Sequence, residues 1–202
     1  MASSTSDPPG VTRVDPRGDV VFEVGDNDLR AHLLVSSKVL GLASPVFMAM
    51  FKRGFQEGEN LFSGSLRPVH LPDDDPEAVT ILCNILHLRH RLIPRVVTLE
   101  TLTNMVVICD KYDCKDAVTS WSIIWLQSWV SSAGPDVLER LLFIAYGLDI
   151  PDVFTKVSHS LLTLHAGPLG LGSMPAAADI LPEALLGMAH MDELDQVTKY
   201  CC

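Results

Sequence analysis

The stretch Ala31 to Gly58, AHLLVSSKVLGLASPVFMAMFKRGFQEG, predicts two helices joined at Ala43-Ser44-Pro45. From His32 onward the apolar residues fall near helical spacing, at Leu33, Leu34, Val39, Leu40 and Leu42. Ser44 offers an N-cap hydroxyl, and Pro45 suits the first position of the second helix. That second helix carries one apolar stripe, which must pack on another element and consists of Val46, Phe47, Met50 and Phe51.

A pair of strands is predicted just before these helices. Val20, Phe22 and Val24 alternate with Val21 and Glu23, which is the pattern of a strand with one well-buried face. A turn follows at Gly25-Asp26-Asn27-Asp28, and alternation resumes from Leu29 to His32. The two segments therefore predict a β-hairpin.

The remainder of the chain is predicted to be mainly helical, apart from a short strand over 69–71. Asp75 can cap a helix that begins at Pro76, and Glu77 favours the positive end of that helix. Thr98 can cap another helix, which closes near Tyr112. Further helices are expected over 117–130, 136–146, 152–165 and 181–191, with a loop over 166–179.

Several separated motifs resemble the BTB/POZ domain in the form common among fungal proteins. They are Asp19-Val20-Val21, Ala31-His32, Leu42 to Phe51, Leu71 to Ala78, and Asp110-Lys111-Tyr112-Asp113. The resemblance covers residues 18–126 and implies an α+β fold, with a small three-stranded sheet packed on a cluster of helices. It leaves a disordered segment over 1–17 and an all-helical extension over 127–202. The residues that it marks as fold-defining are Asp19, His32, Ser44, Pro45, Phe47, Phe51, Asp110 and Tyr112.

The resemblance implies a non-enzymatic protein–protein interaction module that acts as a scaffold or homo-oligomerisation protein. The alternative that it implies is a substrate adaptor of a cullin-RING ubiquitin ligase. In such adaptors a hydrophobic-x-Glu motif follows the second of the paired helices, and Phe55-Gln56-Glu57 fits that motif. An aromatic anchor beside a charge is typical of an interface hot spot and its rim. The other interpretation is that Phe55 packs under its own loop.

Two departures from the family pattern limit what the resemblance implies. Repressor-type members place a basic residue directly after the histidine matched by His32, whereas this chain has Leu33. Their charged corepressor groove is therefore not expected. Those members also dimerise by exchanging a strand and a helix that precede the first core strand, and the Pro-rich residues 1–17 are predicted to supply neither. Any homodimer is expected to rest on helix faces alone.

Composition and charge exclude other classes of protein. The 202 residues are 48% hydrophobic, which is ample for a core, and the net charge of −10 argues against a nucleic-acid partner. The first 18 residues lack the apolar core of a signal peptide, so a cytoplasmic or nuclear location is expected. The segment over 117–135 contains too many serines and threonines for a membrane span, and no membrane partner is expected.

The five cysteines are expected to be reduced in such a compartment. Cys83, Cys109 and Cys114 fall within helical patterns, where cysteine usually behaves as a small buried hydrophobe. The pair Cys201-Cys202 resembles a prenylation signal, but the tail carries no polybasic segment to support it. Either this pair is lipidated or it is simply where the chain stops.

Three groups of residues could carry chemistry, and each has a simpler interpretation. Cys83, His87 and His90 share a helix face that could offer ligands to zinc, but a fourth ligand is missing, and the simpler interpretation is that these are partly exposed histidines at a helix end. His32 could act as a base oriented by Asp19, but no nucleophile motif accompanies it, and the simpler interpretation is a histidine satisfied by hydrogen bonds in the core of the hairpin. The acidic run over 73–75 is better explained as a helix N-terminus than as a calcium loop. We therefore expect no enzymatic activity, no metal and no cofactor.

Overall fold

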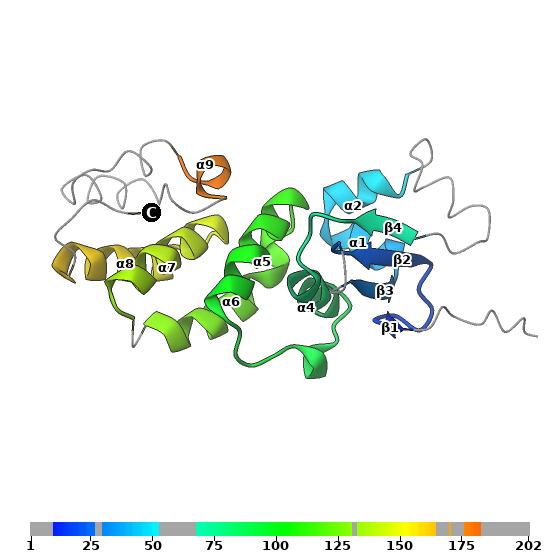
Figure 1. Cartoon of the computed structure of the whole chain (residues 1–202), viewed down its shortest axis with the longest axis horizontal. Coiled ribbons are helices and arrows are strands. Elements are labelled where there is room, and N and C mark those ends of the chain that lie inside the picture. Colours follow the sequence, from blue (N-terminus) through cyan, green and yellow to red (C-terminus); the bar gives the residue numbers. More distant parts are fainter. Residues whose placement is uncertain are drawn as a thin grey trace, which may run out of the picture. The chain divides into compact units, whose positions relative to one another are not determined.

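The protein has a mixed α+β architecture (Figure 1). The computed structural model describes residues 10–26, 30–52, 68–130, 133–164, 170 and 176–182. The chain divides into two compact units, Met1–Pro94 and Arg95–Cys202. In the part of the chain that the structure describes, all β-strands belong to the first unit, and the second unit is helical.

The sheet of the first unit is built around a hairpin. Strands β2 (Val20–Val24) and β3 (Ala31–Val35) pair antiparallel, as the sequence predicts. Strand β1 (Val11–Arg13) pairs parallel with β3, and β4 (Pro68–Leu71) pairs parallel with β2. The order across the described sheet is β1-β3-β2-β4.

Strand β1 overturns two predictions about the N-terminal segment. Residues 1–17 were expected to be disordered and to supply no strand, and the sheet was expected to have three strands. Instead β1 adds a fourth, and the backbone N–H groups of Val14 and Asp15 both donate to the carbonyl oxygen of Leu34, at 3.0 Å. Pairing with a distant strand compensates for the weak local propensity of this Pro-rich segment. Residues 1–9 lie outside the described ranges.

Strand β3 is longer than predicted. Leu33 and Leu34, which were assigned to a helix, are consecutive residues of β3 and are both buried. A strand that is covered on both faces has a continuous apolar run instead of an alternating one, so its pattern cannot be told from that of a buried helix.

The two short helices that follow β3 form as predicted. Helix α1 (Ser37–Ala43) and helix α2 (Pro45–Met50) meet at Ser44. The Ser44 hydroxyl accepts a hydrogen bond from the Phe47 N–H at 3.0 Å and so caps α2.

The core of the first unit is centred on Phe22. Its ring stacks on Phe47 at 5.7 Å and on Phe51 at 6.4 Å, measured between ring centroids. Leu33 and Val69 lie opposite Phe22 on the neighbouring strands. This cluster joins the sheet to the predicted apolar stripe of α2.

Helix α4 (Pro76–Leu86) completes the first unit and packs against β3 and α1. The Asp75 carboxylate accepts from the Ala78 N–H at 2.8 Å, so the predicted cap is confirmed. A short 3-10 turn, η2 (His90–Leu92), follows α4.

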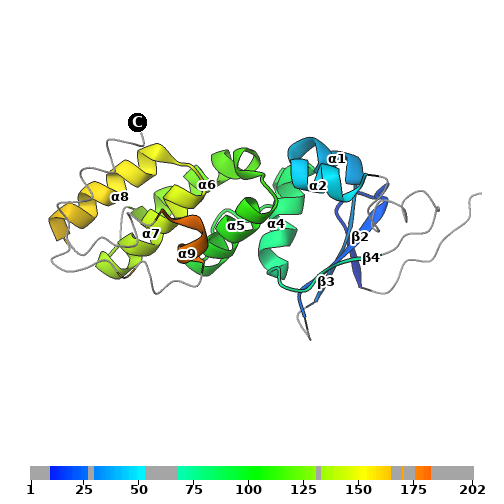
Figure 2. The ribbon, with the colours of Figure 1, turned by 90° about the horizontal axis from the view of Figure 1, so that it is seen from above.

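The second unit is a set of helices around a shared apolar core. They are α5 (Leu99–Lys111), α6 (Lys115–Val130), α7 (Pro135–Gly147), α8 (Pro151–Leu164) and α9 (Ala177–Ile180). Helices α7 and α8 pack side by side (Figure 2). Thr98 caps α5 as predicted, because its hydroxyl accepts from the Thr101 N–H at 3.0 Å.

Two assignments in this half of the chain change. The predicted boundary between residues 126 and 127 falls inside the continuous helix α6, whose Trp125 and Leu126 are buried, so the units separate at Pro94 instead. Helix α9 begins inside the predicted loop over 166–179, at Ala177, which is fully buried. Most of the helix predicted over 181–191 lies outside the described residues.

Candidate functional site

The predicted partner-binding residues Phe55, Gln56 and Glu57 lie outside the described residues. Helix α2, which precedes them, ends at Met50, and strand β4 resumes at Pro68. The motif therefore stays a prediction based on sequence.

The described residues place Asp19 at the start of α1. One carboxylate oxygen of Asp19 accepts from the Ser37 N–H at 2.7 Å, and the other accepts from the Ser37 hydroxyl at 2.6 Å. The adjacent Ser36 N–H donates to Nε2 of His87 at 3.0 Å. A helix of this length is not stable alone, so these two distant side chains position α1.

The bonds of His87 define its protonation state. Nε2 accepts a hydrogen bond, so the ring proton must sit on Nδ1, which lies 2.8 Å from the Cys83 carbonyl oxygen. Burial of the ring lowers the pKa of His87, the Arg89 charge acts in the same direction, and the bond to Cys83 and the Asp15 charge oppose both. His87 is therefore a neutral side chain that joins α4 to α1.

Acidification is expected to destabilise the fold through His87. In the unfolded chain the His87 ring takes up a proton near its usual pKa of 6.5. In the folded chain the pKa of His87 is lowered, so the ring takes up that proton only at lower pH. Between pH 6.5 and the lowered pKa of the folded state, the unfolded state binds more protons than the folded state. The contribution of His87 to the free energy of unfolding is therefore complete above pH 6.5 and is lost as the pH falls through the lowered pKa.

Urea unfolding of the wild type and of His87→Gln, from about pH 7.5 to about pH 5, measures this contribution. Glutamine can still accept from the Ser36 N–H but does not titrate. All other residues are the same in both proteins, so the difference isolates His87. The same pH dependence in both proteins would contradict the assignment.

The interpretation of Cys83, His87 and His90 as a zinc face is not supported by the geometry. Both ring nitrogens of His87 are engaged by backbone groups, and Cys83 is buried. Among the residues that the structure describes, no group of three or more His, Cys, Asp or Glu side chains is placed to hold a metal ion.

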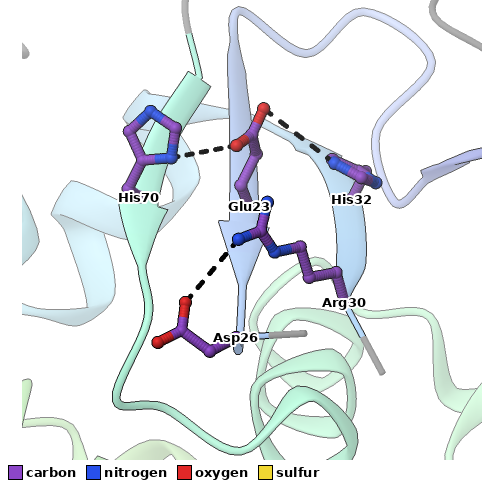
Figure 3. Close-up of polar contacts among 5 residues, drawn as sticks. All are labelled: Glu23, Asp26, Arg30, His32 and His70. Atoms are coloured by element: carbon purple, nitrogen blue, oxygen red, sulfur yellow. Dashed lines mark ion pairs between the residues drawn. The ribbon is translucent and has the colours of Figure 1, made fainter. Parts of the chain in front are cut away.

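A polar row crosses the sheet at Glu23 (Figure 3). Glu23 lies opposite His32 on β3 and opposite His70 on β4. One carboxylate oxygen lies 2.9 Å from Nδ1 of His70, and the other lies 3.9 Å from Nε2 of His32. The carboxylate thus links three adjacent strands on the face opposite Phe22.

This row corrects the predicted pairing of His32. The residue facing His32 is Glu23 and not Asp19, because the antiparallel register places Glu23 directly across from it. Sequence reasoning also missed His70, since nothing local to β4 signals which residue it faces. Cross-strand pairs of this kind add modest stability and fix the strand register.

The acidic run over 73–75 has a structural role at the start of α4. Asp75 caps the helix, and Asp74 is buried. The interpretation of this run as a helix N-terminus is therefore the one that the contacts support.

Asp110 and Tyr112 lie at the corner between α5 and α6. Asp110 forms an ion pair with Lys115 at 2.9 Å, and the Tyr112 side chain is buried. The neighbouring Cys109 and Cys114 are also buried, and neither forms a disulfide. A hydrogen bond to the Cys114 thiol, together with burial, raises the pKa of Cys109. At this corner Tyr112 thus contributes buried packing, and Asp110 contributes an ion pair with Lys115.

None of the helices in the described ranges has the length and apolarity needed to cross a lipid bilayer. No protein-family model matches the chain, and no curated protein matches it either.

Proposed function

We propose that this chain is a non-enzymatic protein–protein interaction module of the BTB/POZ type, acting as a scaffold or homo-oligomerisation protein in the cytoplasm or nucleus. The observation that supports this proposal best is the hairpin β2–β3 followed directly by the paired helices α1 and α2. Its motif residues have structural tasks there, since Asp19 binds the start of α1 and Ser44 caps α2.

The polar groups of the described residues also favour binding over catalysis. Glu23, His32 and His70 form a cross-strand row, and both ring nitrogens of His87 are hydrogen-bonded to backbone groups. Polar contacts of this kind hold strands and helices in place. Stoichiometric zinc in the purified protein would instead favour a metal hydrolase and would count against this proposal.

The second candidate function is a substrate adaptor of a cullin-RING ubiquitin ligase. It is favoured by Phe55-Gln56-Glu57, which follows α2 in the sequence as the hydrophobic-x-Glu motif does in such adaptors. Aromatic side chains at the centre of an interface commonly dominate its affinity.

Size-exclusion chromatography with light scattering tests both functions. The purified chain is expected to elute as a homo-oligomer if it is a scaffold, and a monomer that binds no protein would contradict the proposal. Mixed with a cullin N-terminal domain, an adaptor is expected to co-elute with it, and Phe55→Ala and Glu57→Ala are expected to weaken the complex. Absence of co-elution for the wild type would exclude the adaptor function.

A further inference from the structure

Two buried thiols lie next to each other at the corner between α5 and α6. The Cys114 N–H donates to the Cys109 carbonyl oxygen at 3.1 Å, and the following pair of the same motif joins Asp113 to Asp110 at 3.2 Å. Helix α5 therefore ends in a Schellman motif, with Asp113 at its left-handed position and φ of +48°. The side chains at the two ends of such a motif commonly touch, and here the Cys109 thiol is hydrogen-bonded to the Cys114 thiol.

The end of α7 shows that this motif does not need thiols. There the Ile150 N–H donates to the Ala145 carbonyl oxygen at 2.8 Å, and both side chains are buried. Alanine and isoleucine occupy in α7 the positions that Cys109 and Cys114 occupy in α5. The pair in α5 fills the same space and adds a chemistry that an apolar pair lacks.

The backbone at this corner already has the geometry that a disulfide requires. A disulfide joins residues whose Cα atoms are about 4.4–6.8 Å apart, and the backbone hydrogen bond from Cys114 to Cys109 brings the two residues into that range. The ion pair of Asp110 with Lys115, at 2.9 Å, links the residues that directly follow the two cysteines. A bond between the sulfur atoms therefore needs only a small movement of the side chains.

The two thiols differ in reactivity. The hydrogen bond from Cys109 lowers the pKa of Cys114, although burial and the Asp113 charge oppose this effect. Cys114 is thus the better nucleophile, because the thiolate is the reactive form. Its side chain is buried, but the neighbouring Asp113 is exposed, so opening of the helix end admits an oxidant that is little larger than water.

We propose that Cys109 and Cys114 form a reversible disulfide that covalently joins α5 to α6 when the protein meets a small peroxide such as hydrogen peroxide. The Cys114 thiolate attacks one peroxide oxygen, the O–O bond breaks, and Cys114 sulfenic acid and hydroxide form. The Cys109 sulfur then attacks the Cys114 sulfur, the S–O bond breaks, and the oxygen leaves as water with the Cys109 proton. In sum, two thiols are oxidised to one disulfide, and one peroxide is reduced to two waters.

Peptide mapping of the full-length chain tests this inference. Trypsin cleaves after Arg95, Lys111 and Lys115, so residues 96–111 and 112–115 fall into separate peptides, each with one cysteine. After peroxide treatment of the native protein and alkylation of free thiols, mass spectrometry is expected to find these two peptides joined, and dithiothreitol is expected to separate them. The same treatment in urea is expected to give mixed pairings that include the other cysteines, because the fold no longer selects the partner.

The proposal is overturned if both peptides stay alkylated at peroxide concentrations that fully oxidise free cysteine. It is also overturned if Cys114 is oxidised to sulfinic acid without joining Cys109, or if native Cys114 pairs with another cysteine. The variant with Cys201→Ser and Cys202→Ser is the matched control, and it is expected to form the same joined peptides as the wild type.

Cys109→Ala tests the order of the two steps. Alanine is the residue that α7 has at this position, so the variant is expected to fold, and circular dichroism checks this. Without its partner, Cys114 is expected to stop at the sulfenic acid, which dimedone labels and mass spectrometry detects on residues 112–115. A Cys114 that takes up no dimedone in this folded variant would contradict its assignment as the attacking thiol.

Thermal unfolding measures what the bond does to the second unit. Peroxide-treated wild type is expected to melt roughly 4–8 °C above the reduced protein, because the bond restricts the unfolded chain. The tryptophans of α6 report on the transition, since this helix begins directly after Cys114. Cys114→Ser keeps a side chain of similar size but cannot form the bond, so peroxide is expected to leave its Tm unchanged. An equal shift in this variant would show that the effect does not come from the disulfide.

Discussion

Phe22→Ala is expected to lower the free energy of unfolding by about 3–5 kcal/mol. Phe22 is 0% exposed at the centre of β2, and its ring stacks on both Phe47 and Phe51. Removal of the ring leaves a cavity between the sheet and α2 and breaks two aromatic contacts. Because domains of this size have about 5–15 kcal/mol of total stability, the first unit should be close to unfolding at 25 °C.

Urea unfolding followed by far-UV circular dichroism measures this effect. Glu23→Ala is the matched control, because it changes the next residue of β2 on the opposite face and is expected to cost at most about 1 kcal/mol. If the two substitutions cost the same, Phe22 is not at the centre of the core.

Gly147→Ala is expected to destabilise the second unit by about 1–2 kcal/mol. A Cβ at residue 147 would lie 2.3 Å from Cγ1 of Val106 on α5. Val106 is fully buried and its β-branched side chain is stiff, so it has little room to move away. Alanine has a higher helix propensity than glycine by about 1 kcal/mol, and overpacking, at about 1–3 kcal/mol, outweighs this gain.

Tryptophan fluorescence during urea unfolding reports on the second unit, because all three tryptophans lie in α6. The double variant Gly147→Ala with Val106→Ala is expected to be more stable than the sum of the single effects predicts, since Val106→Ala removes the clashing methyl. A Gly147→Ala protein that is more stable than the wild type would show that α5 and α7 pack less closely than the structure has them.

Local interactions could be predicted from the sequence, and non-local ones could not. The caps at Ser44, Asp75 and Thr98 each bond an N–H three residues ahead, so a short motif contains both partners. His87 and Ser36 are 51 residues apart, and no pattern in either segment indicates their contact. The sequence placed His87 at a helix end as a partly exposed side chain, and the structure shows that this half-buried histidine links α4 to α1.

The same reasoning explains the errors in the sheet and in the unit boundary. Strand β1 is held by hydrogen bonds to β3, and its own residues give little indication of a strand. The limits of the units depend on which helices pack together, and a resemblance in sequence motifs does not contain that information. Glu23 and His70 share a row only because β2 and β4 are parallel neighbours.

The sequence alone determined the hairpin, the paired helices at Ser44-Pro45, most of the later helices and the acidic charge of the chain. These features follow from periodicity, capping residues and composition, which act within a few residues or over the whole chain. Only the tertiary structure decided the fourth strand and the partners of Asp19, His32 and His87. Each of these brings together residues that are far apart along the chain, and the energy that fixes them comes from packing and pairing that no single segment contains.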